Sequence, residues 1–237
     1  RISEGIMKDF NDIVMPGMTH WQHPRFFAYF PSNASPPAIL ADFLASTMAA
    51  QCMLWQTSPA ATEMETRMME WLGQAVGLPK HFKGVIQDSA SSASLTAVLT
   101  MRERALCWQG NKKGLSRLNR LRIYASNENH SSIARAIWIA GIGQENLVRL
   151  PVVGDLRSSD PTALRKAIKA DISAGYTPAG VICVTGATGM GACDDISAMI
   201  KVAKEFNLYI HVDAAWAGSA MICPEFRYLW QGVDDAD

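Results

Sequence analysis

The sequence lacks an excess of charge of either sign, with 22 lysine and arginine residues against 22 aspartate and glutamate residues in 237. Proteins that bind nucleic acid or anionic membranes usually carry a strong positive field, so a neutral chain argues against both partners. The basic stretch 112–122 is therefore predicted to be a solvated connection between elements. A small neutral or zwitterionic ligand suits this balance better.

Long hydrophobic runs are also missing, since no apolar stretch approaches the ~18 residues that are needed to cross a bilayer. The amphipathic first residues do not resemble a secretory signal. The five cysteines are odd in number and widely spaced, without a C-x-x-C pair, which argues against a disulfide framework and a zinc site. We therefore expect a soluble, cytoplasmic protein with reduced thiols and no bound metal.

The chain has the composition of a globular protein, with 49% hydrophobic and 19% charged residues. Apolar residues at helical spacing predict a helix that ends at Pro16-Gly17, and the apolar stretch 38–55 predicts a helix buried on several sides. Ser58-Pro59 predicts the start of a third helix, which ends near Gly77. We expect residues 1–60 to form a helical dimerisation segment.

Residues 61–237 are predicted to form a large α/β domain, incomplete at its C-terminal end. After Lys80, short apolar strands alternate with amphipathic helices, which is typical of a mostly parallel sheet covered by helices. The predicted strands are 85–87, 122–125, 147–150, 181–184 and 209–212. The predicted helices are 92–107, 131–140, 161–174 and 195–206. Because the chain opens without a methionine and stops without an ending signal, we expect it to be part of a longer protein.

Ligands of such sheets bind beyond the carboxyl ends of the strands. Four polar segments of the sequence are candidates for such positions, and the first two of them precede predicted helices. DSASSAS at 88–94 places small hydroxyl residues at a helix start, which fits a phosphate site and equally an ordinary helix cap. In ASNENHSSI at 125–133, His130 follows a strand and precedes a helix. A histidine there serves either a structural or a catalytic role.

The other two segments carry glycines and a carboxylate. The glycines of TGATGMGACDD at 185–195 allow close approach of a ligand, but their order is not that of a dinucleotide site. In HVDAAWAG at 211–218, Asp213 lies just beyond an apolar strand, where a carboxylate is costly without a cation. The four segments together suit a ligand with a phosphate, an aromatic face and a cationic ring nitrogen. Pyridoxal 5′-phosphate has all three features.

Five blocks, in the same order over essentially the whole chain, resemble the aromatic-L-amino-acid decarboxylases, which are group II members of the fold-type-I pyridoxal-phosphate enzymes. The blocks are HPRFFAYFPSNASPPAILADFL (23–44), TSPAATEMETRMMEWL (57–72), VIQDSASSAS (85–94), HSS (130–132) and HVDAAWAGSAMICPEFR (211–227). The resemblance implies a fold-type-I, transferase-like α/β fold. It also implies decarboxylation of tryptophan, tyrosine, dopa or 5-hydroxytryptophan to an arylalkylamine and carbon dioxide.

The resemblance further implies a role for individual residues. Asp213 would pair with the ring nitrogen of the cofactor and His130 would stack over its ring, as the catalytic residues. The residues implied to bind the cofactor are Ser89, Ala90, Ser91, His130, Thr188, Asp213 and Ala215. The residues implied to bind the substrate are Trp21, Tyr29, Phe30, Pro31, Ser32 and Met53. Met53 would reach the pocket of a neighbouring subunit, in a homodimer with its active site at the interface.

The chain departs from the family pattern at Asp88, Ser92, Ala187 and Trp216, where the family usually has glycine, glutamate, threonine and often tyrosine. The family's Schiff-base lysine lies in an N-P-H-K block that is expected beyond Asp237. Three alternatives stay open: a histidine decarboxylase, an aromatic acetaldehyde synthase on the same fold, and a catalytically inactive dimerisation or binding module. The aromatic FFAYFP segment disfavours an acidic substrate.

Overall fold

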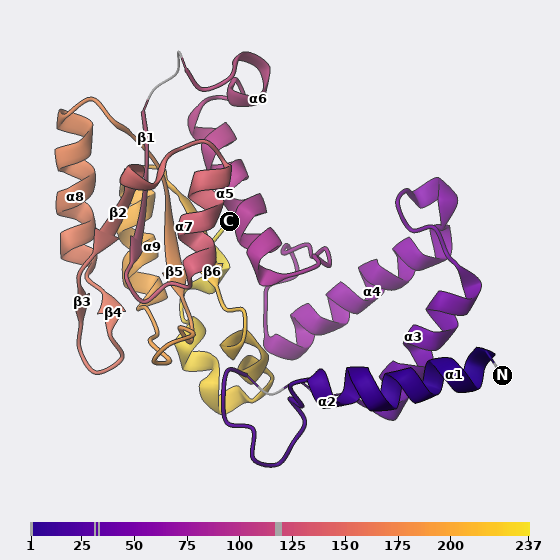
Figure 1. Cartoon of the computed structure of the whole chain (residues 1–237). Coiled ribbons are helices and arrows are strands. Elements are labelled where there is room, and N and C mark those ends of the chain that lie inside the picture. Colours follow the sequence, from indigo (N-terminus) through magenta and orange to yellow (C-terminus); the bar gives the residue numbers. More distant parts are fainter. Residues whose placement is uncertain (1, 31, 33, 117–119) are drawn as a thin grey trace. The chain divides into compact units, whose positions relative to one another are not determined.

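The computed structural model describes residues 2–30, 32, 34–116 and 120–237, and it divides into two compact units, 1–61 and 62–237. In the first unit, α1 (Ile2–Asp9), a π-helical turn (Phe10–Val14) and α2 (Met15–Gly17) follow one another directly (Figure 1). They end at Gly17, as the Pro16-Gly17 pair predicts. After an irregular stretch comes α3 (Pro36–Met48).

Helix α3 is shorter than the predicted helix 38–55. Ser35 caps it by accepting a hydrogen bond from the Ala38 amide, and Ala49 ends it in a left-handed conformation with φ 48°. Five of its apolar side chains are 57–70% exposed, namely Ile39, Leu40, Phe43, Leu44 and Met48. The prediction that this helix is buried on several sides is therefore wrong for the chain by itself, in which these side chains are exposed.

Helix α4 (Pro59–Val76) begins at the predicted proline and runs into the second unit. The helices that follow are α5 (Ala90–Ala105), α6 (Gly110–Lys113), α7 (Ser131–Ile139), α8 (Pro161–Ser173) and α9 (Ile196–Glu205). The strands are β1 (Leu121–Ser126), β2 (Leu147–Leu150), β3 (Val152–Val153), β4 (Ser158–Ser159), β5 (Thr177–Val184) and β6 (Tyr209–Asp213). Short 3-10 turns, Ala217–Ile222, Pro224–Trp230 and Val233–Asp235, follow β6.

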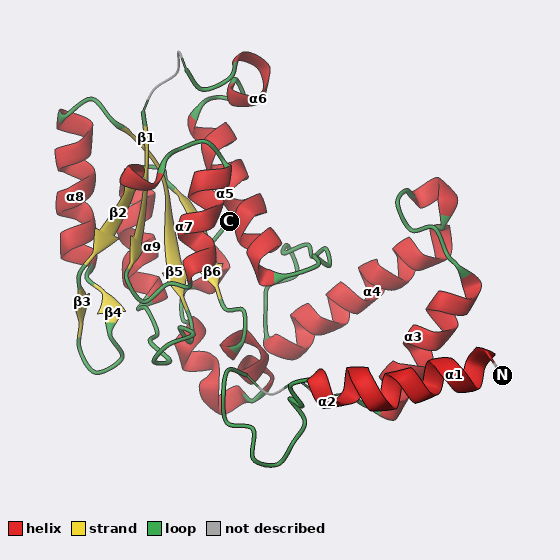
Figure 2. Cartoon of the chain, viewed as in Figure 1, coloured by secondary structure: helices red, strands yellow, loops and turns green. Residues whose placement is uncertain are grey.

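Four strands form one parallel sheet in the order β2-β1-β5-β6, which confirms the predicted α/β class (Figure 2). The alternating side chains of the sheet form two cores. Ile123 and Ile182 face the core of α5 and α7, whereas Tyr124 and Val181 face the core of α8 and α9. Helices thus cover both faces of the sheet. The polar segments that follow the strands lie at its carboxyl edge, where ligands of such sheets bind.

Two details differ from the sequence expectation. Residues 85–87 form no strand in the described structure; instead the Ile86 amide donates a 2.6 Å hydrogen bond to the Glu65 carboxylate. The apolar run there resembles a strand, but a strand also needs a neighbouring ladder. The short antiparallel hairpin β3–β4 was not predicted, since each of its strands has only two residues.

Candidate active site

The carboxyl ends of β1, β5 and β6 bring three of the four polar segments to one edge of the sheet. Val184 at the end of β5 is paired with Asp213 at the end of β6, and the Thr185 amide donates a 2.9 Å hydrogen bond to the Asp213 carbonyl. The described residues after these strands include His130, Thr188 and Ala215. The parallel register therefore gathers segments that lie far apart in the sequence.

Helix α5 runs against the strand direction, so that its N-terminus lies toward the same edge (Figure 1). Near the other end of α5, Arg104 hydrogen-bonds Asn207, which precedes β6. Ser89 is the N-cap, and its hydroxyl accepts a 3.2 Å hydrogen bond from the Ser92 amide. The amides of Ala90 and Ser91 belong to the first turn and have no acceptor within the helix. They are available to an anion such as a phosphate.

His130 caps the N-terminus of α7. Its Nδ1 accepts a 3.2 Å hydrogen bond from the Ser132 amide and lies 2.9 Å from the Ser132 hydroxyl. The side chain is exposed. Because Nδ1 serves as the acceptor, Nε2 carries the proton in the neutral ring.

Asp213 is half-buried, and its carboxylate accepts a 3.2 Å hydrogen bond from the Ala215 amide. No lysine or arginine among the described residues forms an ion pair with it. Two positions before it, burial lowers the pKa of His211, and the negative charge of Asp213 opposes that shift. The carboxylate thus remains available to a cationic group of a ligand.

Thr188 is exposed in a tight loop that connects β5 with α9. The loop is closed by hydrogen bonds from the Gly186 and Ala187 amides to the Ala192 carbonyl, at 3.0 and 2.8 Å. Ala187, where the family usually has threonine, is buried inside this loop. Ala215 lies two positions after Asp213 and is exposed.

The predicted substrate residues lie in the first unit, whereas the predicted cofactor residues lie in the second. The Trp21 ring stacks on Tyr29 with centroids 5.5 Å apart and contacts Phe26 at 5.1 Å. Tyr29 has φ 56° and is 83% exposed. Phe30, Ser32 and Met53 are exposed, and Pro31 lies outside the described residues.

Two arginines that were not predicted as site residues hold the turn between β1 and His130. The Arg149 side chain donates a 3.0 Å hydrogen bond to the Ser126 carbonyl, and Arg157 pairs with Glu128. The hairpin that carries Arg157 does have a sequence signal. The pair Gly154-Asp155, typical of a turn, follows the β-branched residues Val152-Val153 and precedes Ser158-Ser159.

Among the described residues, no group of three or more histidine, cysteine, aspartate or glutamate side chains is arranged to hold a metal ion. No described helix is both long enough and apolar enough to cross a membrane.

Comparisons with known proteins cover nearly the whole chain. Residues 2–237 match the family described as the pyridoxal-dependent decarboxylase conserved domain. The chain is 42% identical to the aromatic-L-amino-acid decarboxylase of Sus scrofa, over 99% of this chain and 50% of that protein.

Two solved structures are similar in fold. Oryza sativa TDC with PLP and tryptamine has a TM-score of 0.91 and 39% identity, over 99% of this chain and 52% of that one. Rhodiola rosea 4-hydroxyphenylacetaldehyde synthase has a TM-score of 0.92 and 36% identity, over 99% and 51%. The chain therefore spans about half the length of the relatives it matches.

Proposed function

Because the chain belongs to the pyridoxal-dependent decarboxylase family, we propose that the full protein uses pyridoxal 5′-phosphate to decarboxylate an aromatic L-amino acid. The products are the corresponding arylalkylamine and carbon dioxide. The named relatives include decarboxylases of tyrosine, dopa and tryptophan, which supports this substrate class. The chain contributes one part of the site, and the lysine that holds the cofactor is expected beyond Asp237.

One observation carries the proposal: Asp213 presents a half-buried carboxylate, without a described lysine or arginine partner, at the edge where the other cofactor residues gather. A carboxylate in this setting stabilises a protonated nitrogen by a charge-assisted hydrogen bond. The Ala215 amide holds one carboxylate oxygen and so orients the group. These features fit the cationic ring nitrogen of pyridoxal phosphate.

The remaining residues fit the other parts of the cofactor. The first-turn amides of Ala90 and Ser91 suit the phosphate, with the α5 dipole favouring its negative charge. The exposed His130 ring suits stacking on a flat heterocycle, and Thr188 and Ala215 suit its edges. When bound, pyridoxal phosphate supplies an electron sink for the electron pair that remains after carbon dioxide leaves. Asp213 keeps the proton on the ring nitrogen, which that chemistry requires.

The aromatic side chains of the first unit support an aromatic substrate. Trp21, Tyr29 and Phe30 offer flat apolar surfaces that suit an indole or phenol ring. Ser32, Pro31 and Met53 belong to the same proposed pocket. Similarity to an acetaldehyde synthase favours a second candidate, in which the same site releases an aldehyde and ammonia in place of the amine, a two-electron oxidation that consumes an oxidant such as dioxygen.

We further propose that residues 1–60 form a dimerisation segment and that the active site lies at the interface of a homodimer. The exposed apolar side chains of α3 support this assignment, because such a surface is normally covered in an assembly. A cytoplasmic location is proposed from the cysteines, which are all free thiols.

The test uses the purified full-length protein. We expect the absorbance of bound pyridoxal phosphate, together with release of carbon dioxide and amine from tryptophan, tyrosine, dopa or 5-hydroxytryptophan. Histidine and glutamate are the comparison substrates, and aldehyde is assayed beside amine to separate decarboxylase from synthase. Faster turnover of glutamate than of every aromatic amino acid would contradict the proposed pocket, and absence of cofactor binding would contradict the proposed function.

A further inference from the structure

Arg157 lies in the turn of the β3–β4 hairpin in a conformation that is unusual for a residue with a side chain. Its φ of 51° is in the left-handed region, which favours glycine. The Nε and Nη2 groups of Arg157 both donate to the same Glu128 carboxylate oxygen, at 3.1 and 2.5 Å. The Glu128 side chain is 13% exposed and the Arg157 side chain 44%.

Glu128 belongs to the turn that leads from β1 to His130. Within this turn, the Glu128 amide donates to the Ser126 hydroxyl, and that hydroxyl donates to the Asn129 amide oxygen, both at 3.2 Å. Arg149 of β2 holds the Ser126 carbonyl. Arg157 is thus the hairpin's side-chain link to the residues that immediately precede His130.

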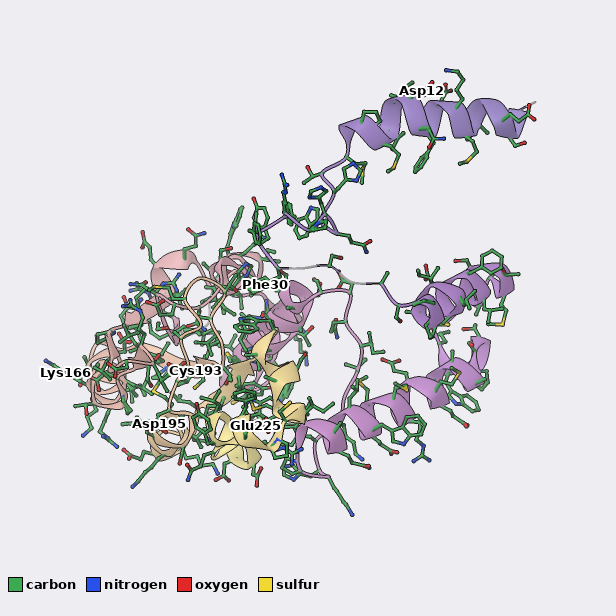
Figure 3. All side chains as sticks on the ribbon, turned by 90° about the horizontal axis from the view of Figure 1, so that it is seen from below. Asp12, Phe30, Lys166, Cys193, Asp195 and Glu225 are labelled. Atoms are coloured by element: carbon green, nitrogen blue, oxygen red, sulfur yellow. The ribbon has the colours of Figure 1, made fainter. Side chains whose placement is uncertain are left out.

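The same hairpin is also bonded to the loop that carries Thr188. The Cys193 amide donates a 3.0 Å hydrogen bond to the Leu156 carbonyl, and the Asp195 amide donates a 2.8 Å hydrogen bond to the Ser158 hydroxyl. Figure 3 labels Cys193 and Asp195 in this part of the chain. Between them, buried Asp194 accepts a 2.6 Å hydrogen bond from the Ser159 amide. One short hairpin therefore joins the His130 turn to the Thr188 loop.

We propose that Arg157 is a positioning residue, which acts through Glu128 to fix His130 relative to the Thr188 loop and so sets the geometry of the cofactor ring site. The inference rests on the proposed function, since it assigns the ring contacts to His130 and Thr188. A partly exposed ion pair adds little to global stability, so the pair is expected to act on local geometry, where it joins the hairpin to the turn before His130.

The experiment compares two arginine variants of the full-length protein. Arg157→Gln removes the ion pair with Glu128. Glutamine has the same backbone preference as arginine, so the substitution does not change the cost of the left-handed φ at this position. The matched control is Arg165→Gln, because Arg165 of α8 makes a two-nitrogen pair with Glu205, the last residue of α9, at 2.9 and 2.6 Å. The readouts are the Kd of pyridoxal phosphate and the circular dichroism of the bound cofactor, which reports the orientation of its ring.

We expect Arg157→Gln to raise the Kd about fivefold and to diminish the cofactor dichroism, while Arg165→Gln changes neither. Glu128→Gln should reproduce the effect, and the double variant should be no worse than either single variant. Arg157→Lys should restore part of the dichroism, because it returns the charge but not the two-nitrogen geometry.

Two results would overturn the inference. Unchanged Kd and dichroism in both Arg157→Gln and Glu128→Gln would show that the pair does not set the ring geometry. Equal losses in Arg165→Gln would assign the effect to general stability. In either case the wild-type protein would still bind the cofactor and release carbon dioxide, so that the proposed function would stand; a wild-type protein that binds no cofactor would remove both.

Discussion

The phenol of Tyr124 donates a 2.9 Å hydrogen bond to the Asp171 carboxylate and so joins β1 to α8. Tyr124 is fully buried, and the Arg122 side chain pairs with the same aspartate at 3.3 Å. Burial, followed by the hydrogen bond and the charge of Asp171, raises the pKa of Tyr124 well above its ordinary value, although the charge of Arg122 opposes this. The folded protein therefore holds the phenol proton more tightly than the unfolded chain does.

This difference predicts a loss of stability at alkaline pH. The contribution of Tyr124 is fully present below the unfolded-state pKa of about 10 and declines as the pH rises above that value. We expect Tyr124→Phe to lower the free energy of unfolding at neutral pH by about 1–2 kcal/mol and to flatten its alkaline decline. Urea unfolding over the neutral to alkaline range measures both effects. Tyr228→Phe is the control, because Tyr228 is exposed; identical pH profiles for wild type and Tyr124→Phe would contradict the prediction.

Substitution of the α5 cap is expected to affect stability and cofactor binding together. Ser89→Ala removes the acceptor of the Ser92 amide and should cost about 1 kcal/mol of unfolding free energy. It should also weaken pyridoxal phosphate binding, since the first turn that is proposed to bind the phosphate would no longer be held. Asp160→Ala is the matched control, because Asp160 caps α8 through the Thr162 amide. A loss of cofactor affinity as large in Asp160→Ala as in Ser89→Ala would argue against a phosphate site at α5.

A charge on α3 is expected to disrupt the proposed dimer. Phe43 is 68% exposed in the chain by itself, and a second copy that covers it would exclude a glutamate from the interface. Phe43→Glu should therefore shift the full-length protein toward monomer in sedimentation velocity. Ile172→Glu places the same charge at a 49% exposed apolar position of α8 and should leave the dimer intact. A stable, active wild-type monomer at micromolar concentration would refute the dimer itself.

The sequence predicted the parts of the fold in which one periodicity dominates. The strand at 147–150 and the start of α8 at Pro161 agree with the structure. A short apolar run favours a strand, and an N-cap residue followed by proline favours the start of a helix. Residues 85–87 were misassigned since an isolated apolar run does not reveal whether a partner strand exists. The Arg157–Glu128 pair could not be predicted, because nothing local connects two charges 29 positions apart.

The charge of Asp213 leads to the sharpest prediction for catalysis. Loss of the substrate carboxylate leaves an electron pair that is stabilised only when the cofactor ring nitrogen is protonated. In the proposed site, Asp213 would favour that protonated form, and the Ala215 amide orients its carboxylate through a 3.2 Å hydrogen bond. Removal of the carboxylate should therefore raise the barrier of the chemical step far more than it weakens cofactor binding, to which the α5 amides also contribute.

We expect Asp213→Ala in the full-length protein to lower the decarboxylation rate constant at least about a hundredfold, on the order of 3 kcal/mol in the barrier. Single-turnover release of carbon dioxide measures the rate constant, and absorbance of the bound cofactor measures occupancy in the same sample. Asp213→Glu should recover part of the rate, because it returns the charge at a changed distance, whereas Asp234→Ala, at an exposed position, should match wild type. A fully loaded Asp213→Ala variant that is nearly as fast as wild type would remove Asp213 from the mechanism, since the ring nitrogen would then be protonated without it.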